Sequence, residues 1–233
     1  MGVIGEGLVE AVRLLATGDP EVIDIMLRTV EVSGAATCLA VVIGVPIGTF
    51  LALTRFLGRG LVVSLVNFGM GLPPVVVGLA TWLCLTRYGP LGFLGLLYTP
   101  AAMIIAQAVI ATPIVAGFTV AAIQAVNPKL RLQMLALGAN RPQYLGLLLR
   151  EARLGILAAV IAGFGGAVSE VGASAMVGGN VRWYTRVATT ATMLEVSKGN
   201  FELATALSII LLLVSFGITA ALTYLQQRGR QPA

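Results

Sequence analysis

Long apolar stretches separated by short polar links dominate the pattern of this sequence. Five stretches are long enough to cross a membrane as helices, because about 20 apolar helical residues span a hydrocarbon core about 30 Å thick. They lie near residues 25–54, 60–86, 101–126, 153–172 and 202–225, and each carries few charges. The pattern therefore predicts an all-α integral membrane protein with five transmembrane helices.

The first 24 residues follow a different pattern. Within residues 3–17, one helical face carries Leu8, Val12 and Leu15, while Glu6, Glu10 and Arg13 lie elsewhere. This arrangement is typical of a short amphipathic helix on a membrane surface, and Gly18-Asp19-Pro20 predicts its end. Glu6 and Glu10 also stand where a cleavable secretory signal would carry positive charge, so we expect no cleavable signal. We divide the chain into a surface helix (1–24), a membrane domain (25–225) and a tail (226–233).

The composition supports the membrane class. Apolar residues make up 58% of the chain and charged residues 11%, and the mean hydropathy is +0.94. Soluble domains carry about 25% charged residues. Cys38 and Cys84 both fall inside apolar stretches, where a thiol packs as a small apolar group, so we expect neither a disulfide nor a metal site.

The Lys and Arg residues predict the direction of the chain. Nine lie in the links after the first and third spans and at the C-terminus: Arg55, Arg59, Lys129, Arg131, Arg141, Arg150, Arg153, Arg228 and Arg230. Six fall on the opposite side: Arg13, Arg28, Arg87, Arg182, Arg186 and Lys198. Because Lys and Arg favour cytoplasmic links, we expect the N-terminus outside and the tail inside. The net charge of +5 then reflects orientation, and we expect no nucleic-acid partner.

The most basic link, residues 127–153, predicts two short helices with a bend. Residues 130–137 favour a helix, Gly138 permits a bend, Asn140 can cap the next helix, and Pro142 suits its first turn. A projecting element of this kind would suit a soluble partner. Alternatively, it is a solvated basic loop that only anchors the topology.

This link resembles the cytoplasmic loop of the membrane subunits of type I ABC importers. The motif of that family runs Glu-Ala-Ala, three residues, Gly, nine residues, then Ile-x-Leu-Pro. Gly138-Ala139 match its centre and Leu148 falls on the Ile position. Leu132-Gln133-Met134 replace Glu-Ala-Ala, and Arg150-Glu151 replace Leu-Pro.

Other stretches resemble the molybdate and tungstate permeases of that family, and the tungstate type most closely. They are LPPVVVG (72–78), RYGPLG (87–92), SEVGASAMVGGN (169–180) and TRVATTATMLE (185–195). The resemblance covers about residues 25–225. It implies an oxyanion importer in the inner or plasma membrane of a prokaryote, although tungstate rather than molybdate rests on resemblance alone.

The resemblance also implies partners. These are a second copy of the chain, a cytoplasmic ATPase dimer that uses Mg-ATP, and an external substrate-binding protein; this chain itself would bind no cofactor. The residues expected to couple to the ATPase are Met134, Ala136, Gly138, Ala139, Asn140, Pro142 and Tyr144.

A second set of residues is expected to line the translocation pathway or its gate: Pro73, Pro74, Ser169, Glu170, Gly172, Asn180, Thr185 and Arg186. Pro73 and Pro74 remove two backbone donors inside an apolar span, which predicts a break that either lines a polar pathway or is a static bend. For Glu170 we expect bonds to backbone or hydroxyl donors, or a pair with Arg182 or Arg186. The alternative is that Glu170 is solvated at the interface.

The remaining features leave other functions open. Small residues at 44–48 and 163–167 suit close helix packing, and they also suit pairing with a second copy. The sequence has no His and no phosphate-binding loop, so we expect no enzyme. An ion-coupled secondary transporter, a channel or a membrane scaffold remain alternatives, although an ion-coupled transporter more often has several ionisable residues within its spans.

Overall fold

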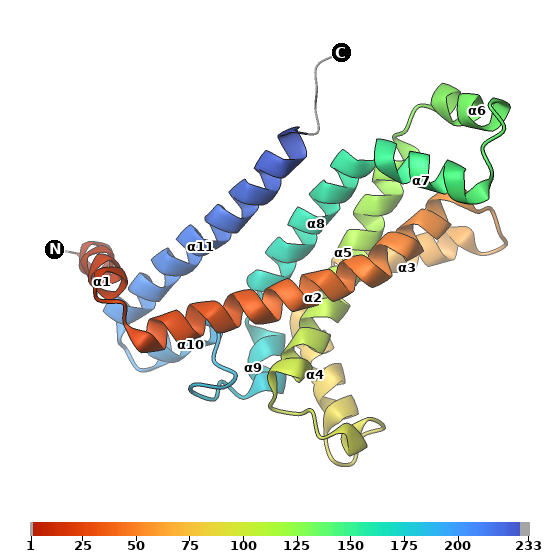
Figure 1. The fold of residues 1–233 in the computed structure, drawn as a ribbon. Helices are drawn as coiled ribbons and strands as arrows, with labels where there is room; N and C mark the ends of the chain where they lie inside the picture. Colours follow the sequence, from red (N-terminus) through yellow and green to blue (C-terminus); the bar gives the residue numbers. More distant parts are fainter. Residues whose placement is uncertain (1, 229–233) are drawn as a thin grey trace.

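The computed structural model describes residues 2–228, and over this range the chain is helical without strands (Figure 1). The predicted tail lies outside the described residues from 229 onward. The elements are α1 (Val3–Thr17), α2 (Pro20–Leu53), α3 (Arg59–Met70), α4 (Pro74–Leu85), the short 3-10 helix η1 (Gly92–Leu94), α5 (Pro100–Gln124), α6 (Pro128–Ala136), α7 (Arg141–Glu151), α8 (Arg153–Val168), α9 (Gly172–Gly178), α10 (Ala188–Ser197) and α11 (Phe201–Arg228).

Three to five spans follow from the lengths and apolar character of these helices. Helices α2, α5 and α11 are each long and apolar enough to cross a membrane. Two further candidates are bent pairs, α3 with α4 at 99° and α8 with α9 at 60°. If each pair is one span, the spans fall on the five predicted stretches.

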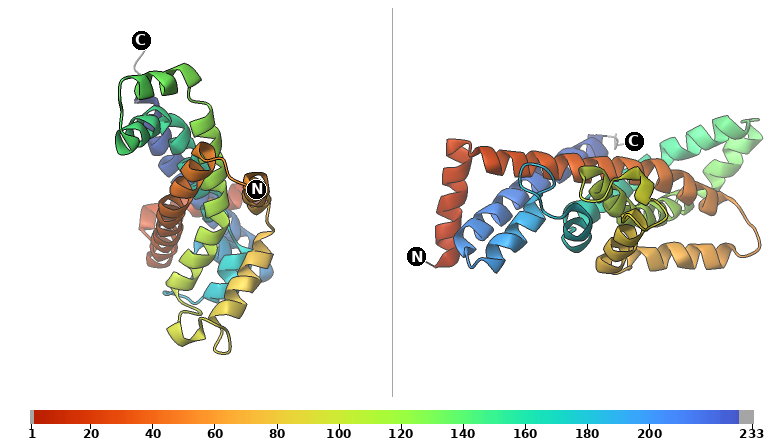
Figure 2. Two further views of the ribbon diagram at one scale, coloured as in Figure 1. Left: turned by 90° about the vertical axis from the view of Figure 1, so that its right-hand side faces the viewer. Right: turned by 90° about the horizontal axis from the view of Figure 1, so that it is seen from below.

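The corner between α1 and α2 explains how the chain turns into its first span. Gly18 closes α1 with φ +61°, a left-handed conformation that favours glycine. The Asp19 carboxylate then accepts hydrogen bonds from the backbone N–H groups of Glu21 and Val22, at 3.0 and 3.1 Å, and Pro20 occupies the first turn of α2. Figure 2 shows α1 lying across the start of α2, beside α11.

The centre of the membrane domain is a close contact of α5 with α2 and α8 through small residues. A Cβ atom placed on Gly44 would lie 3.0 Å from the side chain of Val115, and one on Gly48 would lie 2.5 Å from the carbonyl oxygen of Ala116. From the other side, a Cβ on Gly163 would lie 2.7 Å from Val115. These three glycines therefore pack within one chain and are not free to pair with a second copy.

The basic link forms helices α6 and α7, which project beyond the ends of α5 and α8 (Figure 1). Gly138 lies between them with φ +78°. Asn140 and Gln143 then form a reciprocal cap, in which each side chain accepts a hydrogen bond from the other residue's backbone N–H at 3.0 Å. Leu148 of α7 is buried with Ile123 at the end of α5, so this cluster fixes α7 to the membrane domain.

Two helices were not predicted from the sequence. We expected the fourth span to end at residue 172 and residues 180–200 to form a link, but the structure has α9 and α10 in this region. Helix α9 has only seven residues, and α10 is rich in Thr and Ala without an apolar stripe. Both are stabilised by packing against neighbouring helices, so a periodic pattern could not reveal them.

The positive charges predict that residues 55–60 and 128–150 face the cytoplasm while 88–92 and 180–200 face outside. In a background without Cys38 and Cys84, single cysteines would replace four exposed side chains: Leu57, Leu137, Tyr88 and Tyr184. We expect a membrane-impermeant maleimide added to intact cells to label only the last two.

Permeabilised cells provide the control, because all four cysteines should then react. Labelling of Leu137→Cys in intact cells would reverse the topology and place α6 and α7 outside.

Candidate functional site

The breaks of the two bent pairs lie together. Helix α4 begins at Pro74 after the Pro73 cap, and α9 begins at Gly172. A Cβ atom on Gly172 would lie 3.2 Å from the Val75 side chain, and one on Gly78 would lie 2.6 Å from the Cα of Ala173. The first turns of α4 and α9 are therefore in direct backbone-level contact. We call this contact the paired breaks.

Helix α5 holds α9 from another side. The Gln107 side chain Nε2 donates a hydrogen bond to Ser174 Oγ at 2.9 Å, and a Cβ on Gly178 would lie 2.6 Å from Met103 Sδ. The two contacts are separated by one helical turn on each helix. The residue numbers fall from 107 to 103 along α5 while they rise from 174 to 178 along α9, so the two helices run antiparallel here. Gln107 is 2% exposed, and its Oε1 has no hydrogen-bond partner among the described residues.

Glu170 sits between α8 and α9 and is 6% exposed. Its side-chain Oε1 accepts a hydrogen bond from the Ala173 backbone N–H at 2.6 Å, and its carbonyl oxygen accepts one from Thr189 Oγ1 at 2.9 Å. A carboxylate is favourable here because the N–H groups of the first helical turn have no partners within the helix. The structure thus shows the backbone alternative for Glu170, and among the described residues no ion pair joins it to Arg182 or Arg186, the other alternative.

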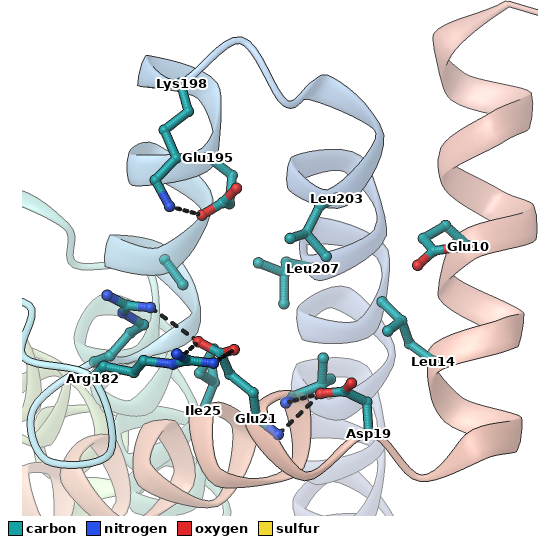
Figure 3. A pocket seen from close by; sticks show the side chains of 13 residues that line it. Glu10, Leu14, Asp19, Glu21, Ile25, Arg182, Glu195, Lys198, Leu203 and Leu207 are labelled. Carbon is teal, nitrogen blue, oxygen red and sulfur yellow. Dashed lines mark hydrogen bonds and ion pairs between the residues drawn. The ribbon is translucent and has the colours of Figure 1, made fainter.

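The two arginines bind Glu21 instead (Figure 3). Arg182 donates two hydrogen bonds to the Glu21 carboxylate, at 2.9 and 2.6 Å, and Arg186 donates one at 3.0 Å. The hydrogen bonds that Arg182 donates to Glu21, and then the negative charge of Glu21, raise the pKa of Arg182 above its ordinary value. The three side chains join the start of α2 to the loop between α9 and α10. Glu21 was not identified from the sequence, which gives no signal for a partner more than 150 residues away.

Three other predicted pathway residues are committed to local bonds. Thr185 Oγ1 donates to the Gly178 carbonyl at 2.6 Å and accepts from the Val181 N–H at 2.9 Å. Asn180 Oδ1 accepts from Thr190 Oγ1 at 3.0 Å, and Ser169 Oγ donates to the Gly166 carbonyl at 3.3 Å. Asn180 and Thr185 therefore shape the turn after α9.

The predicted pathway residues thus form two groups. The first lies at or next to the paired breaks: Pro73, Pro74, Ser169, Glu170 and Gly172. The second lies in the loop that follows α9: Asn180, Thr185 and Arg186. Gln107 and Ser174 belong with the first group and were missed. The available signal was the amide of Gln107, which interrupts the apolar residues 101–111 in α5.

The predicted coupling residues lie on and between α6 and α7. Met134 is buried, Tyr144 and Ala139 are half-buried, and the remaining four are exposed: Ala136, Gly138, Asn140 and Pro142. Apolar side chains are also exposed on α6 and after it, at Leu132, Leu135 and Leu137. Within the described residues, no group of three or more His, Cys, Asp or Glu side chains could hold a metal ion.

Comparison with known proteins decides the family. Residues 44–231 match the family model described as "Binding-protein-dependent transport system inner membrane component". The chain belongs to this family. Two relatives share substantial identity with it across most of the chain.

The first relative is the tungstate uptake system permease protein TupB of Peptoclostridium acidaminophilum. It is 38% identical over 227 residues, which cover 97% of this chain and 100% of that protein. The second is a probable anion ABC transporter permease protein of Haloferax volcanii, 40% identical over 203 residues, covering 85% and 88%.

A solved structure shares the fold. It is titled as inward facing conformations of the MetNI methionine ABC transporter, and it superposes with a TM-score of 0.76 over 91% of this chain and 97% of that one. The sequence identity is 21%, so this likeness concerns the fold alone. The helical membrane architecture of the chain is therefore that of an ABC transporter permease.

The Glu170 cap generates a prediction about stability. Glu170→Ala leaves the buried Ala173 N–H without an acceptor, so we expect it to lower the free energy of unfolding by about 1–3 kcal/mol. Glu170→Gln keeps an acceptor oxygen and should lose less. Thermal unfolding of the purified variants in detergent measures both.

Ser169→Ala is the matched control, because Ser169 is adjacent and exposed. Equal losses from Glu170→Ala and Glu170→Gln would contradict the capping role. Faster anion uptake by Glu170→Ala would instead identify the carboxylate as an electrostatic barrier.

Proposed function

We propose that this chain is the membrane subunit of an ATP-driven importer for a tetrahedral oxyanion, tungstate or the similar molybdate. Support comes from its 38% identity to a tungstate permease over that protein's full length. A second relative is named as an anion permease. Of the two anions, tungstate has the stronger support.

The paired breaks are the observation that carries this proposal. Irregular backbone within a span is tolerated where it is buried in protein or lines a water-filled path, because lipid supplies no hydrogen-bond partners. Here two such interruptions meet beside polar Gln107, Ser174 and Glu170. The Glu170 carboxylate is turned into the first turn of α9, so its charge is partly satisfied by backbone N–H. An anion can then pass this region, because the buried Glu170 carboxylate already accepts a hydrogen bond from the backbone of α9.

Helices α6 and α7 are the proposed contact with a separate ATPase dimer that binds and hydrolyses Mg-ATP. Leu132, Leu135 and Leu137 are exposed on and just after α6, which projects from the membrane domain. At this position their side chains are poorly placed to face lipid. Exposed apolar side chains outside the spans mark a surface for a protein partner. The basic residues of this link support a cytoplasmic position for it, with the N-terminus outside and the C-terminus inside.

The remaining partners complete the proposal. A second copy of the chain would close the pathway, since symmetric dimers are the commonest oligomers. An external substrate-binding protein would deliver the anion to the outer face, as the family description implies. The complex would reside in the inner or plasma membrane of a prokaryote.

Reconstitution tests this function. The chain is placed in liposomes with its ATPase and binding protein, and ATP hydrolysis and anion uptake are measured with tungstate, molybdate and sulfate. We expect tungstate, delivered by the binding protein, to stimulate both activities. Uptake that follows an ion gradient without ATP would favour a secondary transporter or a channel, and no uptake under any condition would favour a scaffold.

Gly138 tests the coupling role. Its φ of +78° is unfavourable for a β-branched residue, whereas asparagine tolerates this region. A Cβ atom there would meet no neighbour within 4 Å, so any effect arises from the backbone. We expect Gly138→Val to insert normally yet lose anion-stimulated ATP hydrolysis and uptake by about tenfold, in line with a strain of about 1–2 kcal/mol.

Gly138→Asn is the matched control and should retain most of both activities. A Gly138→Val variant that assembles and transports at the normal rate would show that this link is an ordinary loop.

A further inference from the structure

A cavity of about 530 Å³ lies apart from the paired breaks, between α1, the start of α2, α10 and the start of α11 (Figure 3). In the close view, Glu10 and Leu14 face it from α1, Leu203 and Leu207 face it from α11, and Glu195 and Lys198 lie at the C-terminal end of α10. None of the residues proposed for translocation except Arg186 lines it.

The walls of this cavity are divided into apolar and charged parts. The apolar part consists of Leu14, Val22, Ile25, Ala191, Leu203 and Leu207. The charged part has four carboxylates, from Glu10, Asp19, Glu21 and Glu195, and three cations, from Arg182, Arg186 and Lys198. A ligand that fills it must therefore combine an apolar portion with groups of both charges.

The existing bonds show which charges remain accessible. Glu21 is shared by both arginines, and Lys198 pairs with Glu195 at 2.6 Å. The Arg182 and Lys198 side chains are still 58% and 54% exposed, so each can meet a further anionic group. Within the part of the chain that the structure describes, Glu10 forms one ion pair, with the largely exposed Arg13 at 3.3 Å. The excess of one carboxylate over the cations favours a ligand that also carries an ammonium.

The position of the cavity points to lipid as the source of such a ligand. The candidate spans α2 and α11 both begin beside it, at Pro20 and Phe201, so it lies at the level where the hydrocarbon layer ends. Helix α1 packs on α11 through Ala11, while an apolar stripe of α1 remains exposed at Ile4, Leu8, Val12 and Leu15. A helix with such a stripe lies in the membrane interface with its apolar face toward the acyl chains. This position puts the cavity within reach of lipid headgroups.

We infer that the cavity binds a phospholipid with a primary-amine headgroup, such as phosphatidylethanolamine. The headgroup phosphate meets Arg182 and Lys198 at the rim, and the ammonium meets the carboxylate side, where Glu10 is available. An acyl chain covers Leu203 and Leu207. A headgroup without an amine would leave Glu10 with only the largely exposed Arg13 as its partner.

Nanodiscs that hold the intact protein test this inference. Wild-type protein and a Glu10→Gln variant are placed in discs of phosphatidylcholine with equal small amounts of phosphatidylethanolamine or phosphatidylglycerol, and co-purified lipid is counted by native mass spectrometry. We expect the wild type to retain phosphatidylethanolamine preferentially. Glu10→Gln should reduce this retention about fivefold, the effect of one charge contact near a membrane surface.

Glu31→Gln is the matched control, because it removes the same charge from an exposed ion pair on α2 outside the cavity. It should leave retention unchanged. Equal retention of the three lipids, a preference for phosphatidylglycerol, or equal effects of the two variants would overturn the inference. So would a change in binding-protein-stimulated ATP hydrolysis by Glu10→Gln with lipid retention intact, since it would assign the cavity to a protein partner.

A soluble headgroup separates lipid from a free ligand. Glycerophosphoethanolamine is added at millimolar concentration to protein in pure phosphatidylcholine discs, and thermal unfolding is followed. An unchanged unfolding temperature supports a membrane lipid as the occupant. A shift that Glu10→Gln abolishes would show a site for a free small molecule and overturn the lipid assignment.

Discussion

Hydrocarbon offers no hydrogen-bond partner to a peptide group, and the arrangement of this chain follows from how it meets that constraint. Unbroken helices satisfy their own backbone, as in α2, α5 and α11. The two broken pairs cannot, so their free groups are matched by side chains and neighbouring helices. Glu170 serves the start of α9, and Thr189 serves the carbonyl of Glu170. Small residues at Gly78 and Gly172 let α4 and α9 approach closely enough to exclude lipid.

Local chemistry made part of this fold predictable. Consecutive prolines at 73 and 74 cannot continue a helix, and the structure breaks there. Asn140 three residues before Gln143 provides both halves of a cap, which the structure forms. Apolar length likewise located the long helices within a few residues. In each case the deciding interaction lies within four residues along the chain.

The contacts that organise the site join residues distant in sequence, and no pattern announced them. Arg186 was expected at the pathway, but its partner Glu21 lies 165 residues away at the start of α2. Gln107 and Ser174 meet across 67 residues only because α5 and α9 run antiparallel. Family resemblance identified the stretch around Glu170, yet the choice between a backbone N–H and an arginine required the three-dimensional arrangement. Sequence thus located the breaks, while tertiary packing determined what surrounds them.

The joining of the first and last helices has a consequence for biosynthesis. Ala11 of α1 and residues of α2 share one buried cluster with Ala206, Leu207 and Ile210 of α11. A ribosome releases α1 and α2 into the membrane long before α11 exists, so this cluster remains open throughout translation. The cluster closes only after α11 has been synthesised. A prematurely terminated chain would therefore expose unpaired helices at the start of α2, which a membrane protease could recognise as a sign of incompleteness.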